Sequence, residues 1–83
     1  MSANDQTLIQ QHHDGLYYIF SNVNAESWDE VNTLKITDAV GCGYRTKWGA
    51  YKFAEQIEDE DPTEYGIRNG ELAKDGAKIV LIP

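Results

Sequence analysis

The chain has 83 residues and a net charge of −7, and 41% of its residues are apolar and 11% aromatic. This length fits one domain, and the aromatic content exceeds that of most disordered chains. The apolar runs are far shorter than the ~20 residues of a membrane-spanning helix, and the single cysteine excludes an intrachain disulfide.

The first segment of the chain, residues 1–14, is polar apart from Leu8 and Ile9. It lacks the basic start and apolar core of a signal peptide. We therefore expect a flexible polar tail over 1–14, a single α+β domain over 15–83, and a cytoplasmic location. His12-His13-Asp14 has no third histidine or cysteine beside it, so we predict neither a metal site nor a cofactor.

The first predicted strand covers residues 15–22, GLYYIFSN. Both of its alternating sets are apolar, which is typical of a central strand covered on both faces. SWDE at 27–30 fits a capping box and predicts a short helix over 28–35. GCG at 41–43 predicts a tight turn or a close backbone approach.

The clearest predicted helix covers residues 46–61. Thr46 is a suitable N-cap, and Pro62 ends the helix because the residue before proline avoids helical geometry. A buried stripe follows the i, i+3, i+4, i+7 pattern at Ala50, Phe53, Ala54 and Ile57.

The C-terminal part carries two turn signals and one apolar run. Asn69-Gly70 predicts a type I′ hairpin, Asp75-Gly76 predicts a second turn, and 77–83 predicts a terminal strand. The fold class is therefore α+β, with a small antiparallel sheet of about three to four strands and two helices on one face.

An acidic run at the end of the second helix is the main candidate site. Its members are Glu55, Glu58, Asp59, Glu60, Asp61 and Glu64. Glu55, Glu58 and Asp59 fall on the side of the helix opposite the buried stripe. The four consecutive acids at 58–61 lie at the negative end of the helix dipole, where each is disfavoured by roughly 0.3–1 kcal/mol at low salt.

The acidic run has two open interpretations, a solvated helix end or a partner-binding patch. A calcium loop is disfavoured because the run lacks the required spacing and contains a proline. As a patch, it suits a basic protein surface that otherwise binds nucleic acid. In size and charge the chain resembles the phage or mobile-element inhibitors of restriction enzymes, nucleases and CRISPR effectors, a resemblance that implies a non-enzymatic inhibitor.

Three aromatic residues outside the stripe, Tyr44, Trp48 and Tyr51, are candidate interface anchors, with packing under a neighbouring element as the alternative. No catalytic constellation surrounds Cys42, so no enzymatic activity and no small-molecule substrate are expected. We expect a monomer or homodimer without membrane contact. The alternative function is DNA binding by a helix-turn-helix-like segment over 31–57, using Arg45, Lys47 and Lys52.

Overall fold

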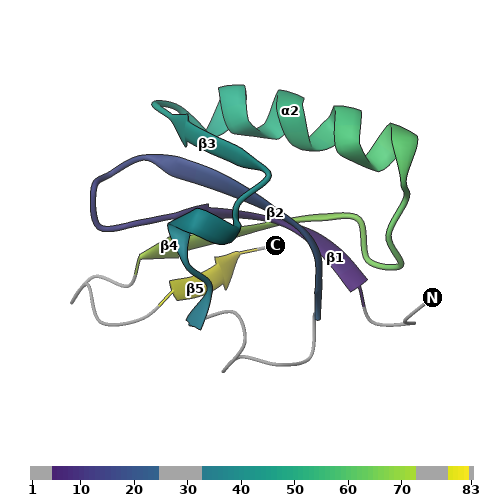
Figure 1. Ribbon diagram of the computed structural model, residues 1–83, viewed down its shortest axis with the longest axis horizontal. Coiled ribbons are helices and arrows are strands. Elements are labelled where there is room, and N and C mark those ends of the chain that lie inside the picture. The colour runs from purple at the N-terminus through teal and green to yellow at the C-terminus, as the bar shows by residue number, and fades with distance from the viewer. Residues whose placement is uncertain (1–4, 25–32, 73–78, 83) are drawn as a thin grey trace.

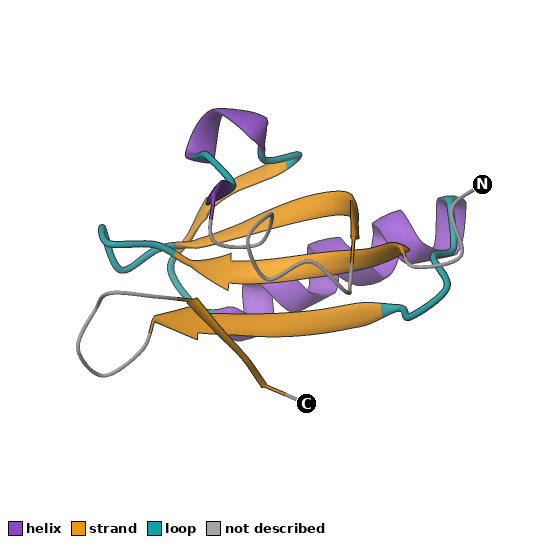
Figure 2. Ribbon diagram, turned by 90° about the horizontal axis from the view of Figure 1, so that it is seen from below, coloured by secondary structure: helices purple, strands orange, loops and turns teal. Residues whose placement is uncertain are grey.

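The computed structural model describes residues 5–24, 33–72 and 79–82. In this part of the chain the strands form one mixed sheet in the order β3-β2-β1-β4-β5, and helix α2 lies across one face of it (Figure 1 and Figure 2). The elements are β1 (Asp5–Gln11), β2 (Tyr17–Asn24), the 3₁₀ turn η1 (Ile36–Asp38), β3 (Gly41–Tyr44), α2 (Lys47–Glu60), β4 (Ile67–Leu72) and β5 (Ile79–Ile82).

Strand β1 is the middle of the sheet. It pairs antiparallel with β2, where Ile9 lies opposite Ile19, and parallel with β4, where Ile9 lies opposite Asn69. Strands β3 and β5 pair antiparallel with β2 and β4 at the two edges. Strands β3 and β4 therefore run in the same direction, and α2 forms the crossover between them.

The two faces of the sheet have separate apolar clusters. On the α2 face the buried residues are Ile9, Ile19, Ala50 and Ala54. On the opposite face they are Leu8, Tyr18, Phe20 and Val23, with Leu34 and Ala39 packed against them. Strand β2 is thus covered on both faces, as its sequence predicts, and neighbouring residues of β1 serve different cores.

The α+β class is confirmed, but three details of the predicted architecture are wrong. The sheet is mixed because β1 and β4 are parallel. Residues 5–11 form the central strand β1, so they are not a tail. One α-helix, α2, covers a face among the described residues; the helix predicted over 28–35 lies largely in 25–32, outside them, and Leu34 packs on the other face.

Two predicted turns are strands. Asn69-Gly70 lies inside β4, where both residues pair with β1 and β5. Residues 41–43 belong to β3, which pairs with β2, so the tight turn predicted there is wrong. The alternative prediction of a close approach is confirmed at Gly41, where an added Cβ would lie 2.5 Å from Phe53 Cε2. The helix-turn-helix outline expected over 31–57 is therefore absent from the described part of that segment, because an edge strand stands where its turn would be.

Candidate binding surface on helix α2

Helix α2 begins and ends as its sequence predicts. The Thr46 hydroxyl accepts a hydrogen bond of 3.1 Å from the backbone N–H of Gly49, and the helix ends at Glu60, two residues before Pro62. Ala50 and Ala54 are fully buried, and Phe53 and Ile57 pack beside them. The apolar stripe fixes which side of α2 faces the sheet, so the opposite side faces solvent.

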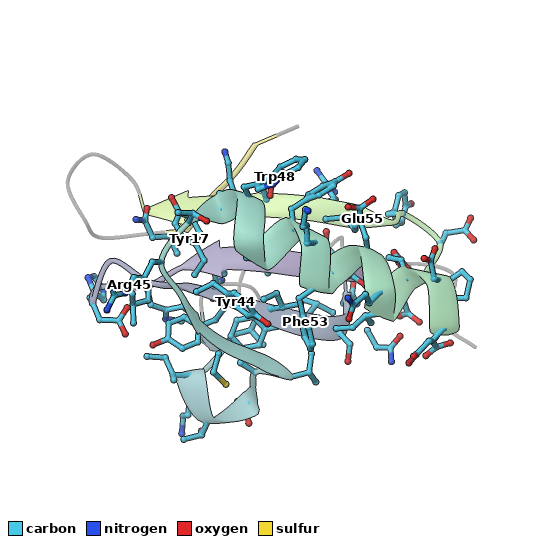
Figure 3. All side chains as sticks on the ribbon, turned by 90° about the horizontal axis from the view of Figure 1, so that it is seen from above. Tyr17, Tyr44, Arg45, Trp48, Phe53 and Glu55 are labelled. Carbon is cyan, nitrogen blue, oxygen red and sulfur yellow. The ribbon has the colours of Figure 1, made fainter. Side chains whose placement is uncertain are left out.

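Tyr44 belongs to the core and lies apart from the exposed side of α2. Its ring centroid is 5.8 Å from that of Phe53, and a Cβ added at Gly49 would lie 3.5 Å from the Tyr44 ring. Figure 3 shows Tyr44 and Phe53 on one side of α2, with Trp48 and Glu55 on the other. Tyr44 therefore lies apart from Trp48 and Tyr51, the two aromatic residues predicted with it as interface anchors.

Trp48 and Tyr51 form an aromatic pair at the start of the solvent side. Trp48 is 66% exposed. The two rings are parallel to within 6°, with centroids 6.2 Å apart, and the Lys52 Nζ lies 5.6 Å from the Trp48 ring centroid. An exposed indole beside a second ring is typical of a contact surface, since it leaves a large apolar area in water.

A pocket of about 240 Å³ lies between this aromatic pair and strand β4. It is lined by Lys47, Trp48, Tyr51 and Asn69, and we call it the aromatic pocket. Asn69 is half-buried, and its side-chain Oδ1 is buried without a hydrogen-bond partner. The sequence did not reveal this pocket, because the Asn-Gly pair that predicted a turn is part of a strand.

Five carboxylates of the acidic run are exposed and form what we call the acidic surface: Glu55, Asp59, Glu60, Asp61 and Glu64. Within the described residues, none of these five carboxylates takes part in an ion pair or a side-chain hydrogen bond. Glu55 and Asp59 follow Trp48 and Lys52 along the same helix face, at spacings of seven residues each. The acidic surface and the aromatic pair are therefore neighbours on one side of α2.

Glu58 differs from the other acids because it holds the turn between α2 and β4. Its Oε2 accepts a 2.8 Å hydrogen bond from the backbone N–H of Thr63, and its Oε1 accepts a 2.5 Å bond from the Thr63 hydroxyl. The Thr63 Oγ1 in turn accepts a 3.1 Å bond from the N–H of Gly66, whose φ is +70°. This turn leads directly into β4, so Glu58 has a structural role.

The other acids of α2 have no comparable internal role. The last turn of α2 contains no basic residue, and its carbonyl ends carry the negative pole of the helix dipole. Glu60 and Asp61 therefore raise the free energy of the helix end. Lys47 and Lys52 lie in the first half of the helix, so α2 is charged against its own dipole from end to end.

The histidine segment is a turn between β1 and β2 that packs on the sheet. The His12 ring lies edge-on to Tyr18, at 5.1 Å, and 5.8 Å from the Phe20 ring. The Tyr18 hydroxyl donates a hydrogen bond to Asp14, and this bond lowers the pKa of Asp14 and raises that of Tyr18. Burial lowers the pKa of His12.

No group of three His, Cys, Asp or Glu side chains suited to a metal occurs in the described part of the chain. Cys42 is exposed at the sheet edge, and its Sγ lies 3.9 Å from the Ala39 carbonyl oxygen. No helix among the described residues is long and apolar enough to cross a membrane.

Comparison with protein-family models, with curated proteins and with solved structures found no significant match. The function of the chain is therefore inferred from the geometry of α2 and its surroundings.

Proposed function

We propose that the chain is a non-enzymatic protein-binding module whose acidic surface docks on a basic surface of a partner protein. The observation that carries this proposal is the exposed, unpaired state of Glu55, Asp59, Glu60, Asp61 and Glu64, because Asp59, Glu60 and Asp61 lie at the unfavourable end of α2. Sequences break a local rule where another requirement constrains them, and a basic partner would supply the missing countercharges.

The charge density favours a surface that otherwise binds nucleic acid. Residues 55–61 carry five carboxylates, four of which belong to the acidic surface, while the fifth, Glu58, is bound by Thr63. At a rise of 1.5 Å per residue they span about 9 Å of helix axis. Duplex DNA has one negative charge per ~1.7 Å, which is about five charges over the same length. The four exposed carboxylates at this end of α2 therefore approach the charge density for which a phosphate-binding groove is built.

Docking of this kind excludes nucleic acid from the partner. The resulting activity is inhibition of a nucleic-acid-handling effector, such as a restriction enzyme, a nuclease or a CRISPR effector. The aromatic pair lies beside the acidic surface and would add apolar contact at its border, as Trp and Tyr do at interface centres.

The test is capture of a partner by tagged protein from nuclease-treated bacterial lysate, compared between variants. One variant carries Glu55→Gln, Asp59→Asn, Glu60→Gln and Asp61→Asn; it leaves Glu58 in place because that residue holds the α2–β4 turn. The control is Asp38→Asn, which removes an exposed acid in η1, remote from the acidic surface.

We expect wild type and control to retain a basic protein that the fourfold variant loses, and salt to release it. Purified partner should then lose its nucleic acid when wild type is added. Retention of the same partner by the fourfold variant with unchanged affinity would show that the acidic surface is not the binding site.

A further inference from the structure

The aromatic pocket combines a stacking surface with positive charge. Trp48 and Tyr51 supply parallel rings, and Lys52 already lies over the indole. Lys47 lines the same pocket at the first residue of α2 and is half-buried. The positive end of the helix dipole adds to the charge of Lys52, so this end of α2 attracts anions although the chain is acidic overall.

The size of the pocket suits one planar group. Sites for drug-sized ligands occupy roughly 300–1,000 Å³, and this pocket has about 240 Å³. The floor is polar at Asn69, where the side-chain Oδ1 is buried without a hydrogen-bond partner. A planar ligand with an N–H edge supplies what this oxygen lacks, since a buried acceptor without a donor is unfavourable.

We propose that the aromatic pocket binds a nucleobase that carries phosphate, either as a free nucleotide or as an unstacked base of a single strand. The base stacks on Trp48, its edge lies toward Asn69, and the phosphate lies near Lys52. Stacking on an exposed aromatic ring with cations beside it is how single-stranded nucleic acids are held without strict sequence selection.

Charge distinguishes this occupant from a protein side chain. An arginine or lysine of a basic partner also stacks on indole rings, but the Lys52 Nζ already lies 5.6 Å from the Trp48 ring centroid and repels a second cation there. A phosphate-bearing base is attracted by the same ammonium group. The aromatic pair borders the acidic surface, with Glu55 four residues after Tyr51, but base stacking needs no protein partner and is tested without one.

The test uses two probes at low salt, adenosine monophosphate and a fluorescein-labelled single-stranded hexamer of deoxyadenosine. Binding is followed by calorimetry for the nucleotide and by anisotropy for the hexamer. In both cases ¹H–¹⁵N spectra report the indole N–H of Trp48 and the side-chain amide of Asn69. We expect saturable binding with shifts at these two groups. Binding of both probes identifies the site as a nucleotide pocket, and binding of the hexamer alone identifies it as a strand site.

Three variants assign the binding to this pocket. Trp48→Ala removes an exposed side chain and should weaken binding roughly 5- to 150-fold, the range for loss of one base–aromatic stack. Lys52→Gln should weaken binding. For the hexamer it should also reduce the slope of log affinity against log salt concentration by about one. The matched controls, Tyr65→Ala and Lys35→Gln, remove an exposed aromatic residue and an exposed cation outside the pocket and should change neither.

Absence of saturation by both probes at millimolar concentration would overturn the proposal. Saturable binding that Trp48→Ala leaves unchanged would also overturn it, because the base would then lie elsewhere. Because no partner protein is present in these assays, failure here leaves the docking of the acidic surface unaffected, and failure of that docking leaves these results unaffected.

Discussion

Gln6 is a polar side chain at a core position of the central strand. It is fully buried, and neither its Nε2 nor its Oε1 has a hydrogen-bond partner. An unpaired buried polar group costs about 1–3 kcal/mol, so an apolar side chain of similar length should be favoured there. We predict that Gln6→Met raises the free energy of unfolding by about 1–2 kcal/mol.

Chemical denaturation measures this change as a higher midpoint with an unchanged slope. The control is Gln11→Met at the end of the same strand, where the side-chain amide bonds the Gly15 carbonyl at 3.3 Å and is half-buried. That variant should be neutral or slightly less stable. A Gln6→Met protein no more stable than wild type would mean that the carboxamide contributes to stability despite its isolation.

His12 gives the fold a dependence on pH. Burial against Tyr18 and Phe20 lowers its pKa, His13 acts in the same direction, and Asp14 opposes both. The unfolded chain therefore binds the proton more readily than the folded one. The stability that neutral His12 contributes is present above the ordinary pKa of 6.5 and is lost as the pH falls below it.

We predict that the free energy of unfolding is flat near pH 8 and declines from about pH 6.5 downward. His12→Phe should reduce this decline, while His13→Gln, at an exposed position, should retain it. Denaturation between pH 8 and 5.5 checks the point and stays above the range in which Asp14 titrates, because its pKa is lowered from 3.8. An equal decline of the free energy of unfolding in the His12→Phe protein would show that another group causes the pH dependence.

Among the elements, the contact between β3 and α2 leaves no room for a methyl group at Gly41. A Cβ there would lie 2.5 Å from Phe53 Cε2 and 2.9 Å from Ile19 Cδ1. We predict that Gly41→Ala destabilises the fold by about 1–3 kcal/mol, the usual cost of overpacking. Thermal unfolding measures the loss, and adding Phe53→Leu should recover part of it.

Gly49→Ala provides the contrasting variant. Its Cβ would lie 3.3 Å from Thr46 Oγ1 and 3.5 Å from the Tyr44 ring, so the contact is tight but the helix gains roughly 1 kcal/mol in propensity. We expect a change near zero. Equal losses of stability in the Gly41→Ala and Gly49→Ala proteins would contradict the assignment of the close contact to β3.

The elements that the sequence predicted are those with complete local signals. Helix α2 has its cap, stripe and proline within one segment, β2 begins with the apolar run YYIF, and β5 is the apolar run IVLI. Strand β1 was missed because DQTLIQQ is mostly polar and becomes a central strand only through pairing with β2 and β4. The turn preference of Asn69-Gly70 was overridden in the same way, because both residues pair with β1 and β5. Long-range pairing often outweighs local conformational preference in a sheet.

The candidate site divides in the same way. The helix period placed Trp48, Glu55 and Asp59 on the solvent side, as found. The aromatic pocket depends on Asn69 from β4, and the structural role of Glu58 depends on Thr63 beyond the helix end. Both contacts form because the chain after Pro62 turns back to the sheet. The helical periodicity of the α2 sequence therefore cannot predict them.

On the scale of the whole molecule, the two proposed binding sites place opposite charges on one face of α2. The aromatic pocket with Lys47 and Lys52 lies at the start of α2, and the acidic surface lies at its end, about 20 Å of helix axis in total at 1.5 Å per residue. Exposed charges at that separation are only partly screened at low salt, because the Debye length is about 30 Å at 0.01 M. The two proposals together therefore require the acids to attract basic proteins and to weaken binding of phosphates at the other end.

Neutralising the acids should consequently change the two affinities in opposite directions. For the variant with Glu55→Gln, Asp59→Asn, Glu60→Gln and Asp61→Asn, we predict loss of the basic partner and tighter binding of the deoxyadenosine hexamer. Stability should also rise, by roughly 0.3–1 kcal/mol for each acid removed from the helix end at low salt. Anisotropy in 10 mM and 150 mM salt measures the second effect, which should shrink at the higher salt as screening increases. Parallel loss of both ligands would instead indicate damage to α2 itself, and a stability below that of wild type in the same samples would identify that cause.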